Sequence, residues 1–148
     1  PDEWVLVGAH LDAWPAGSGA NDNGIGVAAV IEAARTLANA PEPPRRTVRF
    51  VLWGGEEQGM LGSNAWVATH AAELPALALA INYDHGAGKP KGWNTPGRAD
   101  LAQALGPAFG DLFTRFGAVA FESVFACNVD SAPFVLAGVP TLELAPDD

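Results

Sequence analysis

Residues 47–59 read TVRFVLWGGEEQG. The stretch begins with a β-rich apolar run that ends at Trp53, as in a strand buried in a sheet, and Gly54-Gly55 closes it. Glu56 and Glu57 follow at once. Two adjacent carboxylates repel each other unless a cation or a proton separates their roles. A metal ligand beside a general base would satisfy that condition, whereas the alternative is an acidic turn on the surface.

Apolar runs and helical patterns alternate over the rest of the chain. Helical spacing and strand-like runs predict helices at residues 24–37, 60–72, 98–117 and 133–137, and strands at residues 5–9, 47–53, 77–83, 119–125 and 139–144. Pro107 is expected to kink or divide the third helix, and the Gly- and Pro-rich residues 86–97 are expected to form a loop. Strands that alternate with helices pair in parallel through right-handed crossovers. The predicted fold is therefore α/β, a three-layer αβα domain with a mostly parallel central sheet.

Composition narrows the class of protein. The 148 residues carry 8 Lys and Arg against 17 Asp and Glu, a formal net charge of −9, which argues against a nucleic acid partner. No apolar run approaches the roughly 20 residues of a membrane-spanning helix, so no membrane segment is predicted. The one cysteine, Cys127, excludes an internal disulfide and a thiolate-rich zinc site, and it is predicted to be a buried, inert thiol. A single domain over residues 1–148 is expected, with its oligomeric state left open.

Polar side chains follow three of the predicted strands at the point where each strand ends. His10 and Asp12 come after the first strand, Glu56 and Glu57 after the second, and Asp84 after the third. In an open α/β sheet, ligands bind beyond the carboxyl ends of the strands. These side chains are therefore predicted to gather on one rim of the sheet.

A glycine-rich segment, residues 17–24 (GSGANDNG), surrounds another carboxylate, Asp22. Glycines on both sides let the backbone fold close to an ion, whereas the alternative is a helix start with Asp22 or Asn23 as N-cap. His10 and Asp12 admit the same two interpretations. A metal-bound imidazole usually donates its other N–H to an acceptor such as a carboxylate, but a loop His beside a loop Asp would look the same. One imidazole with three carboxylates suits a pair of divalent ions of the zinc type.

Four segments occur in a characteristic order: His10-Leu11-Asp12, residues 19–24 (GANDNG), residues 55–63 (GEEQGMLGS) and Asp84. In that order they closely resemble the co-catalytic zinc aminopeptidase family, which includes bacterial leucyl aminopeptidases, carboxypeptidase Q and glutamate carboxypeptidase. The resemblance covers essentially the whole chain. Residues 10–14 (HLDAW), with Asp84 before residues 86–88 (GAG), look most like the carboxypeptidase Q branch.

The resemblance implies a set of metal ligands for two zinc ions. His10 and Asp84 would bind one zinc, Glu57 would bind the second, and Asp22 would bridge both. A fifth ligand, a His, is expected beyond residue 148, and the strands that precede the His-x-Asp segment in the family are absent. The chain therefore looks like a core truncated at both ends. Its second zinc site would have only Asp22 and Glu57 and would be weak or empty.

The resemblance also implies the chemistry. Glu56 would activate a metal-bridging water for hydrolysis of dipeptides or short peptides, and Asp12 would orient His10. A cis peptide bond is expected between Asp22 and Asn23. Whether the enzyme is an aminopeptidase or a dipeptidase or carboxypeptidase is left open, and family members are commonly exported, so an exported or periplasmic protein is expected.

Three further residues are interpreted beside this site. Ser131 stands in the segment DSAPF (residues 130–134) where the family usually has a His, and the family's motif shapes the substrate pocket, so the change is expected to affect specificity. His85 is expected in a supporting or surface position, and His70 is expected to be solvated.

Two other functions remain as alternatives. A relative that has kept the fold as a binding domain would be non-catalytic, and a glutaminyl-cyclase-like acyl transferase would use one zinc. Relatives of both kinds tend to lack part of the ligand set. All four expected ligands and the base are present here, which favours the exopeptidase.

Overall fold

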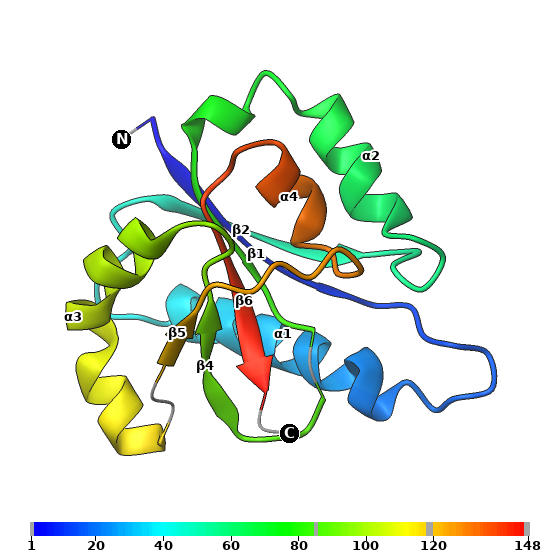
Figure 1. The fold of residues 1–148 in the computed structure, drawn as a ribbon, viewed down its shortest axis with the longest axis horizontal. Coiled ribbons are helices and arrows are strands. Elements are labelled where there is room, and N and C mark those ends of the chain that lie inside the picture. The colour runs from blue at the N-terminus through cyan, green and yellow to red at the C-terminus, as the bar shows by residue number, and fades with distance from the viewer. Residues whose placement is uncertain (1, 85, 118–119, 147–148) are drawn as a thin grey trace.

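The computed structural model describes residues 2–84, 86–117 and 120–146. Predicted residues His85 and Val119 lie outside these ranges. The elements follow one another in this order (Figure 1): β1 (Trp4–His10), η1 (Ala20–Gly24), α1 (Ile25–Ala38), β2 (Thr47–Trp53), α2 (Leu61–Thr69), η2 (Leu74–Ala76), β3 (Leu77–Asn82), β4 (Pro90–Asn94), α3 (Ala99–Phe116), β5 (Ala120–Glu122), α4 (Ala132–Leu136) and β6 (Thr141–Pro146).

The strands form one six-stranded sheet in the order β2-β1-β3-β6-β4-β5. All neighbouring pairs are parallel except β4 and β6, which are antiparallel. In Figure 1, α1 passes behind the sheet, while α4 lies in front of it with α2 beside it. The α/β fold with a mostly parallel sheet is therefore confirmed.

Strand register brings the ends of the central strands to one edge. His10 at the end of β1 lies opposite Trp53 at the end of β2. On the other side of β1, Gly8 lies opposite Asn82, which ends β3 and pairs in turn with Glu143 of β6. Because parallel strands end at the same edge, the loops after β1, β2 and β3 leave the sheet together.

An aromatic core joins the sheet to α2 and α4. Trp53 lies 6.3 Å from Trp66 of α2 and 5.8 Å from Phe134 of α4, measured between ring centroids. Trp4 meets the edge of Trp66 at 5.8 Å, an arrangement that aromatic pairs prefer. Gly8 is required by this packing, since a Cβ there would lie only 2.6 Å from the Trp53 Nε1.

Two predicted elements take a different form. Residues 90–94, expected to lie in a loop, form the strand β4, because they pair with β6 on one side and β5 on the other. The helix around Pro107 forms as a single element, α3, so the chain is not divided in two there. Its Phe109 packs against Trp93 of β4, with 6.3 Å between the ring centroids.

Two side chains differ from the sequence-based expectation in burial. Cys127 is exposed rather than buried, because it lies in the coil between β5 and α4, where the neighbouring Phe125 is also 45% exposed. His70 is half-buried rather than solvated, because its ring stacks on Trp66 with 4.3 Å between centroids.

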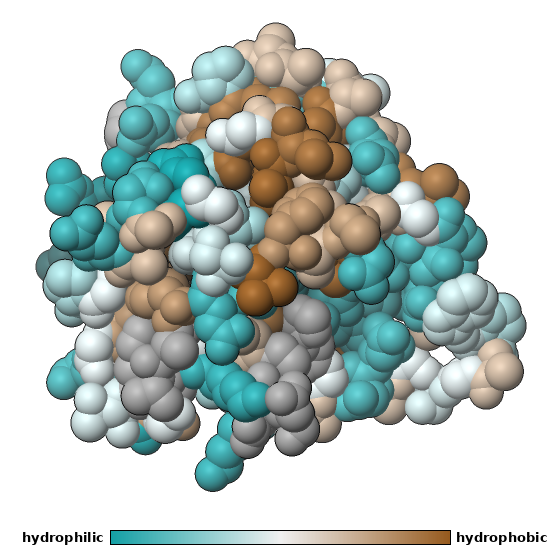
Figure 2. Space-filling view, viewed as in Figure 1, coloured by the Kyte–Doolittle hydropathy of each residue, from teal (hydrophilic) through white to brown (hydrophobic). Residues whose placement is uncertain are grey.

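The surface viewed in Figure 2 carries apolar side chains over α4 and α2, where Leu136 is 79% exposed. Within the described ranges, no helix combines the length and the apolar character that crossing a bilayer requires.

Candidate active site

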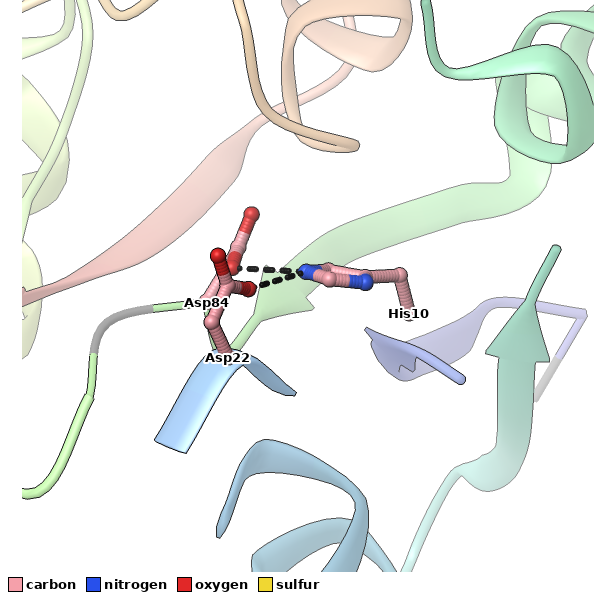
Figure 3. A group of neighbouring side chains, drawn as sticks. All are labelled: His10, Asp22 and Asp84. Carbon is pink, nitrogen blue, oxygen red and sulfur yellow. Dashed lines mark hydrogen bonds and ion pairs between the residues drawn. The ribbon is translucent and has the colours of Figure 1, made fainter. Parts of the chain in front are cut away.

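His10 is the centre of the site. It is the last residue of β1 and only 1% exposed. Its Nδ1 lies 2.9 Å from the main-chain carbonyl of Asp12, which can only accept, so Nδ1 carries a proton. Its Nε2 lies 3.0 Å from Oδ1 of both Asp22 and Asp84 (Figure 3). The second ring nitrogen, Nε2, therefore faces two carboxylates.

The charges around His10 favour a cation at this point. Burial alone would lower the pKa of the His10 imidazole, but the hydrogen bond and negative charge of Asp84 outweigh it and raise the pKa to about 9. In the absence of any other cation, a proton on Nε2 therefore balances the two carboxylates. A divalent ion among the same three atoms would take the place of that proton.

Asp12 makes two sets of contacts, one through its main chain and one through its side chain. Its main-chain carbonyl accepts the His10 Nδ1–H, whereas the carboxylate expected in that place lies 3.8 Å from Nδ1 through its Oδ1. Its carboxylate instead accepts the main-chain N–H groups of Glu56 at 3.1 Å and Glu57 at 3.3 Å. One side chain thus fixes the loop after β2 against the loop after β1.

Asn23 fixes the loop that carries Asp22. The Asp22–Asn23 peptide bond is cis, as predicted. The buried Asn23 side chain donates to the Tyr83 carbonyl at 2.8 Å and accepts the Gly26 N–H at 3.1 Å. It therefore caps the first turn of α1 and also ties η1 to the residue before Asp84. A Cβ at Gly26 would overlap both the Asn23 side chain and the Tyr83 carbonyl.

Replacing Asn23 with Ala is expected to destabilise the metal-free protein by about 1–3 kcal/mol, because the half-buried Tyr83 carbonyl loses its donor and α1 loses a cap. Equilibrium denaturant unfolding measures the difference. Asn21→Ala is the matched control, since Asn21 is an exposed amide two residues away, and its effect should stay within about 0.5 kcal/mol. Equal stability of the two variants would contradict the assigned role of Asn23.

Glu56 and Glu57 lie half-buried after β2. Burial and then the charge of Asp84 raise the pKa of Glu56 to about 7, close to the range in which a carboxyl exchanges protons at neutral pH. Burial and then the charge of Asp22 raise the pKa of Glu57. Oε1 of Glu57 is buried and has no hydrogen-bond partner among the described residues. An unpaired buried carboxylate oxygen is costly unless an ion occupies the space it faces.

The donor set fits divalent metal ions. Ligand atoms of His10, Asp22 and Asp84 lie within 4.8 Å of one another. Glu57 lies outside this group but lines, with Asp22, the same hollow of about 220 Å³. One imidazole nitrogen with carboxylate oxygens is a set that zinc accepts. The structure therefore brings together three of the four predicted ligands, and places the fourth beside Asp22.

A layer of buried acids lies beneath the site, and the sequence did not predict it. Ser63 Oγ donates to Asp130 Oδ1 at 2.5 Å, and Asn82 Nδ2 donates to Glu143 Oε2 at 3.0 Å. Burial raises the pKa of Asp130 to about 6 and that of Glu143 well above its ordinary value, and the charge of Asp84 adds to both shifts. The sequence held two signals, a lone Glu in the apolar run of β6 and the segment of residues 130–134, which was interpreted only as shaping the substrate pocket.

Ser131 belongs to this buried layer. It is 3% exposed, and its hydrogen bond to Glu143 opposes the rise in the pKa of that carboxyl. Ser131 therefore contacts Glu143 beneath the rim, and its predicted influence on specificity stays a prediction.

Comparison with known proteins gives one consistent result. The model of peptidase family M28 matches residues 1–148. The chain is 35% identical to the probable lipoprotein aminopeptidase LpqL of Mycobacterium tuberculosis over 93% of its length and 30% of that protein. It is 34% identical to carboxypeptidase Q of Rattus norvegicus over 99% of its length and 31% of that protein. The chain thus spans about a third of the length of these relatives.

Solved structures of similar proteins include members of the same peptidase family. A peptidase M28 precursor from Shewanella amazonensis superposes with a TM-score of 0.86 at 37% identity, covering 99% of this chain and 33% of the other. A zinc aminopeptidase from Bacillus subtilis gives 0.79 at 27% identity, covering 99% and 36%. A glutaminyl cyclase from an Acidobacteriales bacterium gives 0.75 at 23% identity, covering 97% and 54%, and shares the fold alone. The fold by itself therefore does not distinguish a peptidase from a glutaminyl cyclase.

Proposed function

The chain belongs to peptidase family M28, and we propose that it forms the catalytic core of a two-zinc exopeptidase acting on dipeptides or short peptides. One observation carries the proposal. The Nε2 of His10 lies 3.0 Å from both Asp22 and Asp84, on the rim where Asp12 holds the main chain of Glu56 and Glu57. A binding domain without catalysis would not need this combination of converging donors and an adjacent carboxyl.

In this proposal His10 and Asp84 would hold one zinc ion, Glu57 would hold the second, and Asp22 would be shared between the two. The position of Asp22 supports its shared role, since it lies beside His10 and also lines the hollow with Glu57. When bound, zinc would polarise the scissile carbonyl and lower the pKa of the attacking water.

Glu56 performs the proton transfers. Its carboxylate accepts a proton from the attacking water and then donates that proton to the nitrogen of the leaving amine. Asp12 holds the Glu56 main chain in place, which limits the positions that its carboxylate can reach. The His10 Nδ1–H stays with the Asp12 carbonyl throughout and keeps the ring oriented.

The test is removal and return of metal. Treatment of the intact protein with 1,10-phenanthroline is expected to abolish the release of amino acids from dipeptides, and Zn²⁺ should restore it, because both the carbonyl and the water depend on the ion. Mass spectrometry of the metal content should find two equivalents of zinc. Full activity without metal would contradict the proposal. Ammonia release from peptides with N-terminal Gln, without peptide cleavage, would assign the cyclase alternative instead.

A further inference from the structure

Trp14 stands between two hollows at the rim of the sheet. One, of about 220 Å³, contains Asp22, and the other, of about 270 Å³, contains Glu56, Met60 and Asn128. Trp14 and Glu57 line both hollows. The Trp14 side chain is 60% exposed, in contrast to Trp4 and Trp53, which lie in the core.

Single exposed apolar side chains are common and need no function by themselves. The place of Trp14 distinguishes it from the others. Leu136 is even more exposed, at 79%, but lies on α4 away from the two hollows. Trp14 instead presents a broad apolar ring beside two carboxylates assigned to metal binding and proton transfer, where a substrate must pass.

The two hollows are not equivalent. Only the larger one contains Glu56, the group that would hand a proton to the leaving amine. The residue on the leaving side of the scissile bond must therefore lie next to this hollow. Its volume of about 270 Å³ falls just below the range of pockets for whole small molecules, as suits a single large side chain.

The lining of this hollow indicates the preferred side chain. Trp14 and Met60 offer an indole face and a thioether, both of which favour apolar and aromatic groups. The Glu56 carboxylate brings negative charge, which disfavours an acidic side chain. We propose that Trp14 is a specificity-determining residue that contacts the substrate and selects an apolar or aromatic residue on the leaving side of the bond, held between Trp14 and Met60. This inference rests on the proposed exopeptidase function.

The test compares two dipeptides that differ only in the leaving residue, Ala-Phe and Ala-Gly, on the zinc-loaded intact protein. Trp14→Ala should lower kcat/KM for Ala-Phe by about 10–200-fold, the range by which an apolar pocket discriminates. The same variant should change kcat/KM for Ala-Gly by less than about 3-fold, because glycine places no side chain in the hollow. Trp14→Phe should retain most of the preference, and Leu136→Ala should match the parent on both substrates. Zinc content should be the same in all four proteins.

An equal loss on both dipeptides would overturn the inference, because Trp14 would then support the site without selecting a side chain. A loss that follows the first residue, seen with Phe-Gly against Ala-Gly, would also overturn it.

A second measurement does not need turnover. The indole N–H resonance of Trp14, identified by its absence in Trp14→Phe, should shift on titration with a non-hydrolysable phosphinic analogue of Ala-Phe, and less with that of Ala-Gly. If the protein releases no amino acids, the exopeptidase proposal fails, and this resonance still decides whether Trp14 contacts a peptide. An unchanged resonance with both analogues would reject the contact.

Discussion

Replacing Glu56 with Gln is expected to lower kcat by about 10²–10⁴-fold, the usual contribution of a positioned general base. Gln has the same shape but cannot hold the transferred proton. The substitution leaves the ligand group of His10, Asp22 and Asp84 untouched, and the Glu56 main-chain N–H still donates to Asp12. Zinc content and KM should therefore change little, so the loss should appear in kcat.

The neighbouring amide provides the control for this prediction. Gln58 is exposed and lines neither hollow, so Gln58→Ala should keep the parent kcat. Steady-state assays on a single dipeptide, with metal content measured in the same samples, separate loss of the base from loss of zinc. A Glu56→Gln protein that keeps both its zinc and its full kcat would exclude Glu56 as the base.

The sequence predicted the central strands well because their signals are local. The run 47–53 matches β2 residue for residue, and the strands predicted at residues 5–9 and 77–83 differ from β1 and β3 only at their ends. Because neighbouring parallel strands end at the same edge of the sheet, the polar residues that follow them lie close together at that edge. With this geometric rule, the amino-acid sequence alone was enough to predict that His10 and Asp84 lie close together.

Contacts between distant segments had no such local signal. The carboxylate of Asp12 reaches main-chain N–H groups 44 and 45 residues away, and Asn23 reaches a carbonyl 60 residues away. Because every residue type offers the same main-chain groups, the identity of a residue does not indicate which main-chain group will be the hydrogen-bond partner. The strand β4 was missed for a related reason. Its sequence PKGWN is short and contains both Pro and Gly, and only its pairing with β5 and β6 makes it a strand.

Replacing Asp22 with Ala is expected to reduce both zinc occupancy and activity more than removing any other ligand. Asp22 lies 3.0 Å from the His10 Nε2 and also shares a hollow with Glu57, so its loss would weaken both ion sites. The activity should fall by at least about 100-fold, since even residues that only support metal ligands contribute about 10–100-fold. The Asp22 side chain is 60% exposed, so the stability of the metal-free fold should change little.

Metal stoichiometry in three variants tests the sharing directly. In zinc buffered by a weak chelator, His10→Ala and Glu57→Ala should each lose about one equivalent, whereas Asp22→Ala should lose both. Asp111→Ala, at an exposed carboxylate on α3, is the control and should keep the parent stoichiometry. If Asp22→Ala loses no more zinc than His10→Ala, then Asp22 serves one ion only. Glu57, with its otherwise unpaired Oε1, would then have to bind the second ion without a shared carboxylate from this chain.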